Sequence, residues 1–350
     1  MGQAQQTTWQ AVGNNGEPDP VTPSVTVYSM LDLAITSPND TIADALAATV
    51  PAAQAAEKSG YQRVWYAEHH NMPSIASSAT SVLIAHVAAH TTTIRLGAGG
   101  VMLPNHSPLT IAEQYGTLAE LHPGRIDLGL GRAPGGDLAM LAALRRTPGD
   151  AENFPTDIIE LQSYLGDRLP TDAVNAYPGR GTKVPLYILG SSLFGAQLAA
   201  RLGLPYAFAS HFAPAALKQA LTVYRDTFQP STVLDAPYTI AALNVIAGDD
   251  PAWAANEMRR TQRQRLRGFL KNRAADLSEA DLDSILDSPH GDAIRDMMRY
   301  TAQGTVGQVR DYVRTFLDDT GADEIIVAHA VSDLDARLRS IDILAEALTN

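Results

Sequence analysis

An alternation of two kinds of segment constrains the fold of this chain more than any other feature of its sequence. From Val25 onward, short apolar runs alternate with longer amphipathic segments, a pattern typical of a parallel sheet with crossover helices. We expect strands at residues 25–33, 63–69, 94–101, 126–131, 185–190, 206–210, 238–246 and 324–329. We expect helices at residues 41–59, 77–90, 109–121, 154–168, 195–202, 214–228, 251–272, 305–320 and 332–348. Eight strands in this pattern predict an α/β protein with a (β/α)8 barrel of the TIM type.

A doubly wound open sheet is the competing fold for such an alternation. Its dinucleotide-binding turn, Gly-x-Gly-x-x-Gly, is absent after the first expected strand. Two helix starts also agree with the barrel pattern: Ser107-Pro108 precedes the third expected helix, and Thr305 with Gln308 opens the eighth. The barrel is therefore preferred.

The domain organisation follows from composition along the chain. Residues 1–24 are rich in Gln, Asn, Gly and Pro and predict a flexible tail, whereas residues 25–350 predict one barrel domain. Two connections are too long for simple loops: residues 133–153 after strand four and residues 249–304 after strand seven. The second connection is expected to be helical, with a basic stretch followed by an acidic one. It is either a lid over the strand ends or a helical insertion that faces solvent.

Composition excludes several classes of function. The net charge of −12 disfavours binding to nucleic acid or to an anionic membrane surface. The absence of cysteine excludes disulfides, thiolate metal sites and a cysteine nucleophile. No apolar run approaches the ~18 residues of a membrane span, and no signal peptide is evident. We therefore expect a cytoplasmic protein whose partners are small molecules.

The richest chemistry lies at the end of the second expected strand. Glu68, His69, His70 and Asn71 follow the apolar run there, and strand ends hold catalytic side chains rigidly. An imidazole with an orienting partner, either Glu68 or Asn71, suits general acid/base work. Metal binding is disfavoured, because metal-binding helices space their histidines at i and i+4 and no third ligand is evident nearby. The competing interpretation is that these are turn histidines satisfied by backbone carbonyls.

Three further clusters follow later strands. Gly99 and Gly100 lie inside a strand pattern, where glycine indicates close approach of a flat ligand, a bulge or tight packing. Arg132 follows strand four among glycines that leave an anion room to approach.

The last cluster turns strand five into a helix. Its amides and hydroxyls suit a phosphate at the helix N-terminus, although Gly-Ser-Ser is also an ordinary N-cap. Its spacing lacks the Gly-x-Ser-x-Gly pattern of a serine hydrolase. The residues concerned are Gly190, Ser191, Ser192 and Gly195.

Together these motifs resemble the bacterial luciferase-like flavin monooxygenase family. The resemblance runs from Val25 to about residue 345 and is strongest in the segments AEHHNMPSIASSATS, LGAGGVMLPNHSPL, PGRIDLGLGRAPGG and GSSLFGAQLAARLGLPYAFASHFAP. It implies an eight-stranded β/α barrel that binds FMN, or in a related branch a deazaflavin, at the carboxyl ends of the strands. It also implies a homodimer packed through the early helices.

The resemblance also assigns roles to single residues. His69 matches the family's acid/base histidine, with Glu68 beside it, and Gly99-Gly100 matches a pair joined by a non-prolyl cis peptide behind the flavin ring. Arg132 matches a phosphate-binding arginine.

The matched phosphate site departs from the family at two positions. Ser191, Ser192 and Gly195 lie where the family holds the flavin phosphate. Gly195 replaces a hydroxyl residue and Ser191 replaces an acidic one, so Arg132 is expected to carry more of the phosphate binding.

The implied function is a monooxygenase that receives reduced FMN from a separate flavin reductase and uses oxygen on an apolar small molecule. No nicotinamide-binding turn is visible, which favours an external source of electrons. Two alternatives stay open: hydride transfer with a deazaflavin, and flavin binding without turnover. Expected liners of the substrate pocket are Leu31, Met102, Phe208, His211 and Phe212.

Overall fold

The computed structural model describes residues 26–349, except 38–39, 134–136, 168–173 and 275. The expected tail at residues 1–24 lies outside the described residues. Among the described helices, none is long and apolar enough to cross a membrane.

A closed barrel of parallel strands forms the centre of the molecule. The described strands are β1 (Val27–Asp32), β2 (Arg63–Tyr66), β3 (Arg95–Met102), β4 (Ile126–Gly131), β5 (Leu186–Gly190), β6 (Tyr206–Phe208), β7 (Thr239–Ala247), β8 (Thr301–Gly304) and β9 (Glu324–His329). Strands β1 to β7 pair in sequence order, and β9 closes the ring by pairing with both β7 and β1. The predicted TIM barrel is confirmed, and its eight strands overlap the eight predicted runs.

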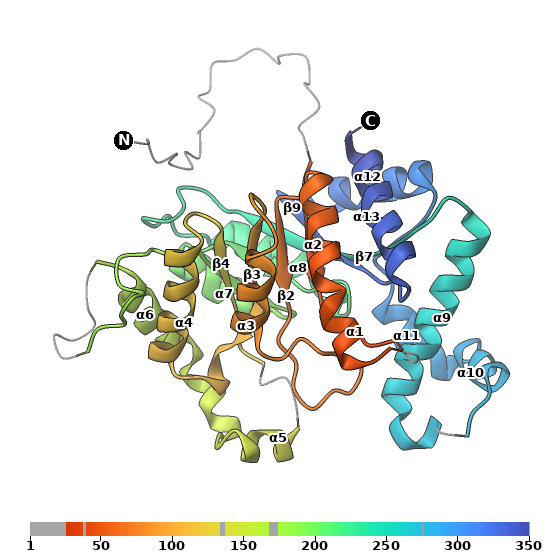
Figure 1. Ribbon diagram of the computed structural model, residues 1–350, viewed down its shortest axis with the longest axis horizontal. Helices are drawn as coiled ribbons and strands as arrows, with labels where there is room; N and C mark the ends of the chain where they lie inside the picture. The colour runs from red at the N-terminus through yellow and green to blue at the C-terminus, as the bar shows by residue number, and fades with distance from the viewer. Residues whose placement is uncertain (1–25, 38–39, 134–136, 168–173, 275, 350) are drawn as a thin grey trace, which may run out of the picture.

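Helices surround the strands (Figure 1). The described helices are α1 (Ile42–Ala47), α2 (Thr49–Lys58), α3 (Thr80–Ala88), α4 (Pro108–Leu121), α5 (Leu138–Ala143), α6 (Phe154–Leu165), α7 (Leu193–Leu202), α8 (Leu217–Thr227), α9 (Pro251–Leu270), α10 (Glu279–Leu286), α11 (Asp292–Met297), α12 (Val306–Thr320) and α13 (Leu334–Thr349). The predicted helix starts are confirmed: α4 begins with Pro108 after Ser107, and Thr305 caps α12 in a capping box with Gln308.

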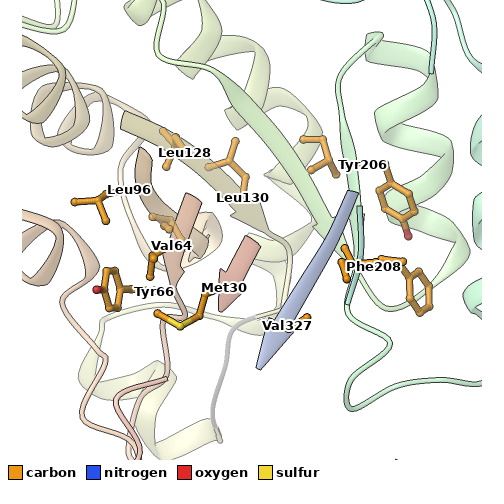
Figure 2. Packing of buried hydrophobic residues seen from close by; sticks show 14 of the residues in the cluster. Met30, Val64, Tyr66, Leu96, Leu128, Leu130, Tyr206, Phe208 and Val327 are labelled. Atoms are coloured by element: carbon orange, nitrogen blue, oxygen red, sulfur yellow. The ribbon is translucent and has the colours of Figure 1, made fainter. Parts of the chain in front are cut away.

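The outer faces of the strands pack against the helices in one large apolar core. Figure 2 shows part of this layer, with Met30, Val64 and Leu128 on three different strands pointing away from the barrel axis. Side chains alternate along a strand, so the residues between them face the barrel interior. That interior holds a second, smaller apolar cluster that includes Leu31 and Trp65.

A buried charge network fills the barrel interior near the amino ends of the strands. Arg63 donates to Asp127 at 2.8 Å and pairs in bidentate fashion with Glu324 at 3.0 and 3.1 Å. Arg95 also donates to Asp127, so two arginines face two carboxylates. Because both acids are fully buried, the network has to be paired to be tolerated. In TIM barrels, residues at the amino ends of the strands contribute to stability, and this network lies at those ends.

The insertion after β7 contains more than the predicted helices. Its helices α9, α10 and α11 group at one side of the molecule (Figure 1). Its last residues form β8. This strand pairs in parallel with the second half of β7, whereas β6 pairs with the first residues of β7. The sequence did not predict this strand because its four residues, Thr-Ala-Gln-Gly, form no apolar run. The insertion after β4 contains α5 and a 3₁₀ turn at Pro148–Asn153, and its residues 134–136 lie outside the described residues.

Candidate active site

Each predicted site residue lies at or near the carboxyl end of a barrel strand. His69 follows β2, Gly99 and Gly100 lie in the last half of β3, Arg132 follows β4, and the turn at 190–192 follows β5. The strands are parallel, so these residues share one end of the barrel. This is the end at which TIM barrels place their active sites.

Arg132 lies against the first turn of α7. Its guanidinium carbon is 4.2 Å from the centre of the Phe194 ring, and its Nε donates to the carbonyl of Ala151 at 3.2 Å. Ser192 is the N-cap of α7, but its hydroxyl makes no capping hydrogen bond. Ser191 and Ser192 are both exposed. A guanidinium, free hydroxyls and a helix N-terminus therefore come together, which is a donor set suited to a phosphate.

The two glycines of this turn bring β5 and α7 close together. A Cβ on Gly195 would lie 3.3 Å from the Tyr206 ring and 3.4 Å from the Cα of Gly190. These contacts are tighter than ordinary packing, so any side chain at residue 195 would push its neighbours aside. Gly195 is also buried, and it can offer a ligand only backbone atoms.

The Gly99-Gly100 peptide bond is cis, as the resemblance implies. A Cβ on Gly99 would lie 2.8 Å from Leu31 and from Trp65, and a Cβ on Gly100 would lie 2.6 Å from the carbonyl oxygen of Gly129. Side chains are therefore excluded at both positions by the barrel itself. Of the three interpretations of these glycines, tight packing is therefore the one that the contacts show.

Glu68 is the centre of a hydrogen-bond cluster that the sequence did not reveal. Its Oε1 contacts Nε2 of His70 and Nε2 of His106, both at 2.8 Å, and its Oε2 accepts the backbone N–H of Met102 at 3.2 Å. Burial opposes ionisation, but hydrogen bonds from His106 and His70 outweigh it and lower the pKa of Glu68. The hydrogen bond with Glu68 raises the pKa of His70.

The same cluster forms a possible metal-binding group that was not evident from the sequence, and it includes His70 but not His69. One ligand atom each from Glu68, His70 and His106 lies within 4.8 Å of the others. The group therefore could hold a metal ion, although the two imidazoles already satisfy the carboxylate oxygen without one. The expectation of no metal stays a prediction. The signal for His106 was present in the LPNHSPL segment, but nothing in the sequence connected it to Glu68.

His69 is held by its backbone while its ring remains available. Its N–H donates to Ser77 at 3.0 Å and its carbonyl accepts from the Ser78 hydroxyl at 2.8 Å. Its Nδ1 is buried and has no hydrogen-bond partner among the described residues. Burial lowers the pKa of His69, and Glu68 opposes this only in part.

Glu68 is the orienting partner of His70, whereas Nδ1 of His69 has no partner among the described residues. The Glu68 carboxylate hydrogen-bonds His70 and His106, and Asn71 is exposed with a backbone φ of 55°. The strand was also predicted to reach residue 69, but β2 ends at Tyr66. The chain leaves the strand earlier because the backbone of His69 pairs with the 77–78 segment instead.

A second histidine, His211, lies near His69 at the end of β6. Burial lowers the pKa of His211 to about 3, with Arg265 and His69 acting in the same direction. Its Nδ1 is buried without a partner among the described residues. One expected pocket liner is wrong, because Phe208 packs in the outer core. Phe212 is half-exposed beside His211, and its place in the pocket stays a prediction.

Known proteins resemble the chain over nearly its whole length. A family model described as luciferase-like monooxygenase matches residues 28–324. A luciferase-like monooxygenase of Escherichia coli K12 is 46% identical over 92% of this chain and 97% of its own. An N-acetyl-S-alkylcysteine monooxygenase of Bacillus subtilis is 41% identical over 52% of this chain and 56% of its own.

Solved structures agree with the fold. The crystal structure of apo-MsnO8 superposes with a TM-score of 0.82 at 33% identity, covering 93% of this chain and 98% of its own. Two structures share the fold at lower identity. A type II Baeyer-Villiger monooxygenase in complex with FMN has a TM-score of 0.68 at 14% identity and covers 91% of this chain and 96% of its own. An F420-dependent secondary alcohol dehydrogenase has a TM-score of 0.68 at 16% identity and covers 92% and 98%.

Proposed function

The chain belongs to the luciferase-like monooxygenase family, and we propose that it uses reduced FMN and oxygen to oxidise an apolar small molecule. Reduced FMN supplies two electrons, one oxygen atom enters the substrate and the other leaves as water. The observation that carries the proposal is the meeting of Arg132 with the N-terminus of α7 at the strand ends.

The phosphate of FMN would be bound mainly by Arg132. Its position over the Phe194 ring leaves guanidinium N–H groups free for an anion, because its hydrogen bond within the described residues uses only Nε. The hydroxyls of Ser191 and Ser192 and the first N–H groups of α7 complete the donor set. Gly195 contributes no side chain, so this site depends on Arg132 more than a site with another hydroxyl would.

The flavin ring would lie over the backbone of Gly99 and Gly100 with His69 at its edge. The glycine pair presents no side chain that would hold a planar ring away. His69 has a buried, unpartnered Nδ1, which is an atom that a ligand can satisfy.

His69 would move the proton that the reaction requires. Its lowered pKa leaves the imidazole uncharged at neutral pH, so it first accepts a proton and then returns it. Glu68 would act through its neighbours. Its carboxylate holds His70 and His106 by hydrogen bonds, and its negative charge favours the protonated form of His69. Helix α9 packs on the strand ends and would help to exclude water there.

Hydride transfer with a deazaflavin is the second candidate. It is supported by the F420-dependent dehydrogenase that shares the fold. The monooxygenase names of the more similar relatives favour the first candidate. Both candidates would use the same phosphate site.

The proposed partners are a flavin reductase, in transient contact, and a second copy of the chain. The homodimer, formed through the early helices, is proposed from the family resemblance alone. Analytical ultracentrifugation of the purified protein tests the dimer. A monomer at micromolar concentration would contradict it.

The function is tested by two measurements on the purified protein. The first is equilibrium titration with FMN, reduced FMN and F420 under anaerobic conditions, in which we expect reduced FMN to bind most tightly. The second is product analysis with reduced FMN, oxygen and a panel of thioethers, aldehydes, ketones and aromatics. Preferred binding of F420 would replace the proposal with the second candidate. Tight flavin binding without any oxygenated product would indicate a non-catalytic flavin-binding protein.

A further inference from the structure

Helix α9 carries two rows of polar residues that face different parts of the molecule. One row, at four-residue spacing, consists of Arg259, Arg263 and Arg267 and pairs with acidic residues of and after α10. These pairs join part of the basic run of the insertion to part of its acidic run.

The other row faces the barrel. Glu257 accepts from the backbone N–H of Ser332 at 3.2 Å, and Thr261 donates to the carbonyl of Ala330 at 3.1 Å. Arg265 is the next residue in this row, one turn further along. It therefore points toward the strand ends and not toward α10.

Arg265 differs from the other arginines of α9 because it has no acidic partner. It donates to Oδ1 of Asn244 at 3.0 Å and to the carbonyl of His211 at 3.5 Å, and it forms no ion pair within the described part of the chain. A guanidinium has five N–H donors, so most of its capacity is unused. Burial lowers the pKa of Arg265 to about 10, which still leaves it charged at neutral pH.

The guanidinium lines a cavity of about 70 Å³ at the ends of β1, β7 and β9. A single water needs roughly 10–15 Å³ measured in this way, so the cavity has room for a small polar group. Asp32 and Arg337 also line it and pair with each other at 3.4 Å, while Oδ2 of Asp32 is buried without a hydrogen-bond partner among the described residues. Burial lowers the pKa of His211 and of His329 to about 3, so both are neutral, and the charge of Arg265 is left without a counterpart.

The position of this cavity relative to Arg132 follows from the order of the strands. In the ring of eight, the β4–β5 side, where Arg132 meets α7, lies opposite the β9–β1 side. His69 after β2 and His211 after β6 lie between these two sides. A ligand held through its phosphate at β4–β5 would therefore leave the Arg265 cavity for a different molecule.

We propose that Arg265 binds a carboxylate of the substrate in this cavity, so that the substrate is an apolar acid and not a neutral aldehyde or ketone. The inference rests on the proposed function, because it assigns the opposite side of the barrel to the flavin. Leu31 and Leu33 on the cavity wall provide the apolar surface for the rest of the molecule.

The test is calorimetric titration of the FMN-loaded protein with straight-chain carboxylates from acetate to octanoate and with the matched primary amides. We expect the best carboxylate to bind about tenfold or more tightly than its amide. Arg265→Met should weaken carboxylate binding about 10- to 100-fold and leave amide binding unchanged, whereas Arg265→Lys should restore part of it. Arg267→Met, which removes a charge from the same helix on the α10 side, should behave as wild type.

The outcomes separate this inference from the proposed function. Equal binding of acid and amide by the wild type, or unchanged carboxylate binding by Arg265→Met, would overturn the role of Arg265. Loss of FMN binding in Arg265→Met would assign Arg265 to the flavin and overturn it as well. Failure of the wild type to bind FMN in either its oxidised or its reduced form would instead refute the proposed function, and the same titrations without FMN would still test the carboxylate site.

Discussion

The guanidinium carbon of Arg132 lies 4.2 Å from the centre of the Phe194 ring, which fixes a positive charge at the N-terminus of α7. Stacking of this kind holds an arginine in place and leaves the edges of its guanidinium available for an anion. The contact joins residues from two different strand ends. It gives the proposed phosphate site a definite geometry before any ligand binds.

Replacing Arg132 with methionine should weaken FMN binding about 10- to 100-fold, because a charged hydrogen-bonding partner of the phosphate is lost. Fluorescence titration measures the effect, with riboflavin as the matched ligand that lacks phosphate. Riboflavin binding should be nearly the same in wild type and in Arg132→Met. Equal weakening for both flavins would mean that Arg132 does not bind phosphate.

The Glu68 cluster predicts how His70 titrates. The pKa of His70 in the folded protein lies above 6.5. The stability that His70 contributes is therefore complete below pH 6.5 and is lost as the pH rises through the raised pKa. The pKa of Glu68 lies below 4.5, so its contribution is complete above pH 4.5 and is lost as the pH falls through the lowered value. Both contributions are therefore present between these limits.

In Glu68→Gln, the pKa of His70 should fall, because burial then acts without the carboxylate. NMR titration of the His70 ring measures the shift. An unchanged His70 would show that the two side chains are not in contact.

The lowered pKa of His69 predicts the shape of the pH–rate profile. If the uncharged imidazole is the active form, kcat rises through an apparent pKa below 6.5 and is level above it. His69→Ala should lower kcat about 10²- to 10⁴-fold and remove this limb, while reduced FMN binds normally. Full turnover by the variant, or a rate that falls over the same pH range, would contradict the role of His69.

The buried network at the other end of the barrel should carry stability and not activity. Asp127→Asn breaks contacts with Arg63 and Arg95 and leaves buried charge unpaired, which should cost about 3–5 kcal/mol in the free energy of unfolding. Denaturant unfolding measures this cost. Asp319→Asn removes an exposed partner of Lys218, and because solvent screens such a pair it should cost much less than Asp127→Asn. Equal effects of the two variants would refute the structural role of Asp127.

The sequence predicted the barrel because its strands are apolar, separated and long enough to stand out. It missed β8, whose Thr-Ala-Gln-Gly residues pair only because the insertion returns them to the end of β7. It also placed Phe208 in the pocket, although the alternation of β6 turns that ring into the outer core.

The site was predictable in part for the same physical reason. His69, Arg132 and the turn after β5 each follow a strand, so parallel pairing alone brings them to one end. The contacts between separate strand ends were not predictable. His106 contacts Glu68 although 38 positions of the chain separate them. Arg265 differs from Arg263 and Arg267 only because those two arginines pair with acidic residues of α10.

The most direct test of the account is a crystal of the protein soaked with FMN. We predict density for the phosphate between Arg132 and the N-terminus of α7, with the flavin ring over Gly99 and Gly100 and its edge near His69. The cavity beside Arg265 should remain free of flavin. Flavin density with its phosphate on Arg265, or a ring bound away from the Gly99-Gly100 backbone, would contradict the account.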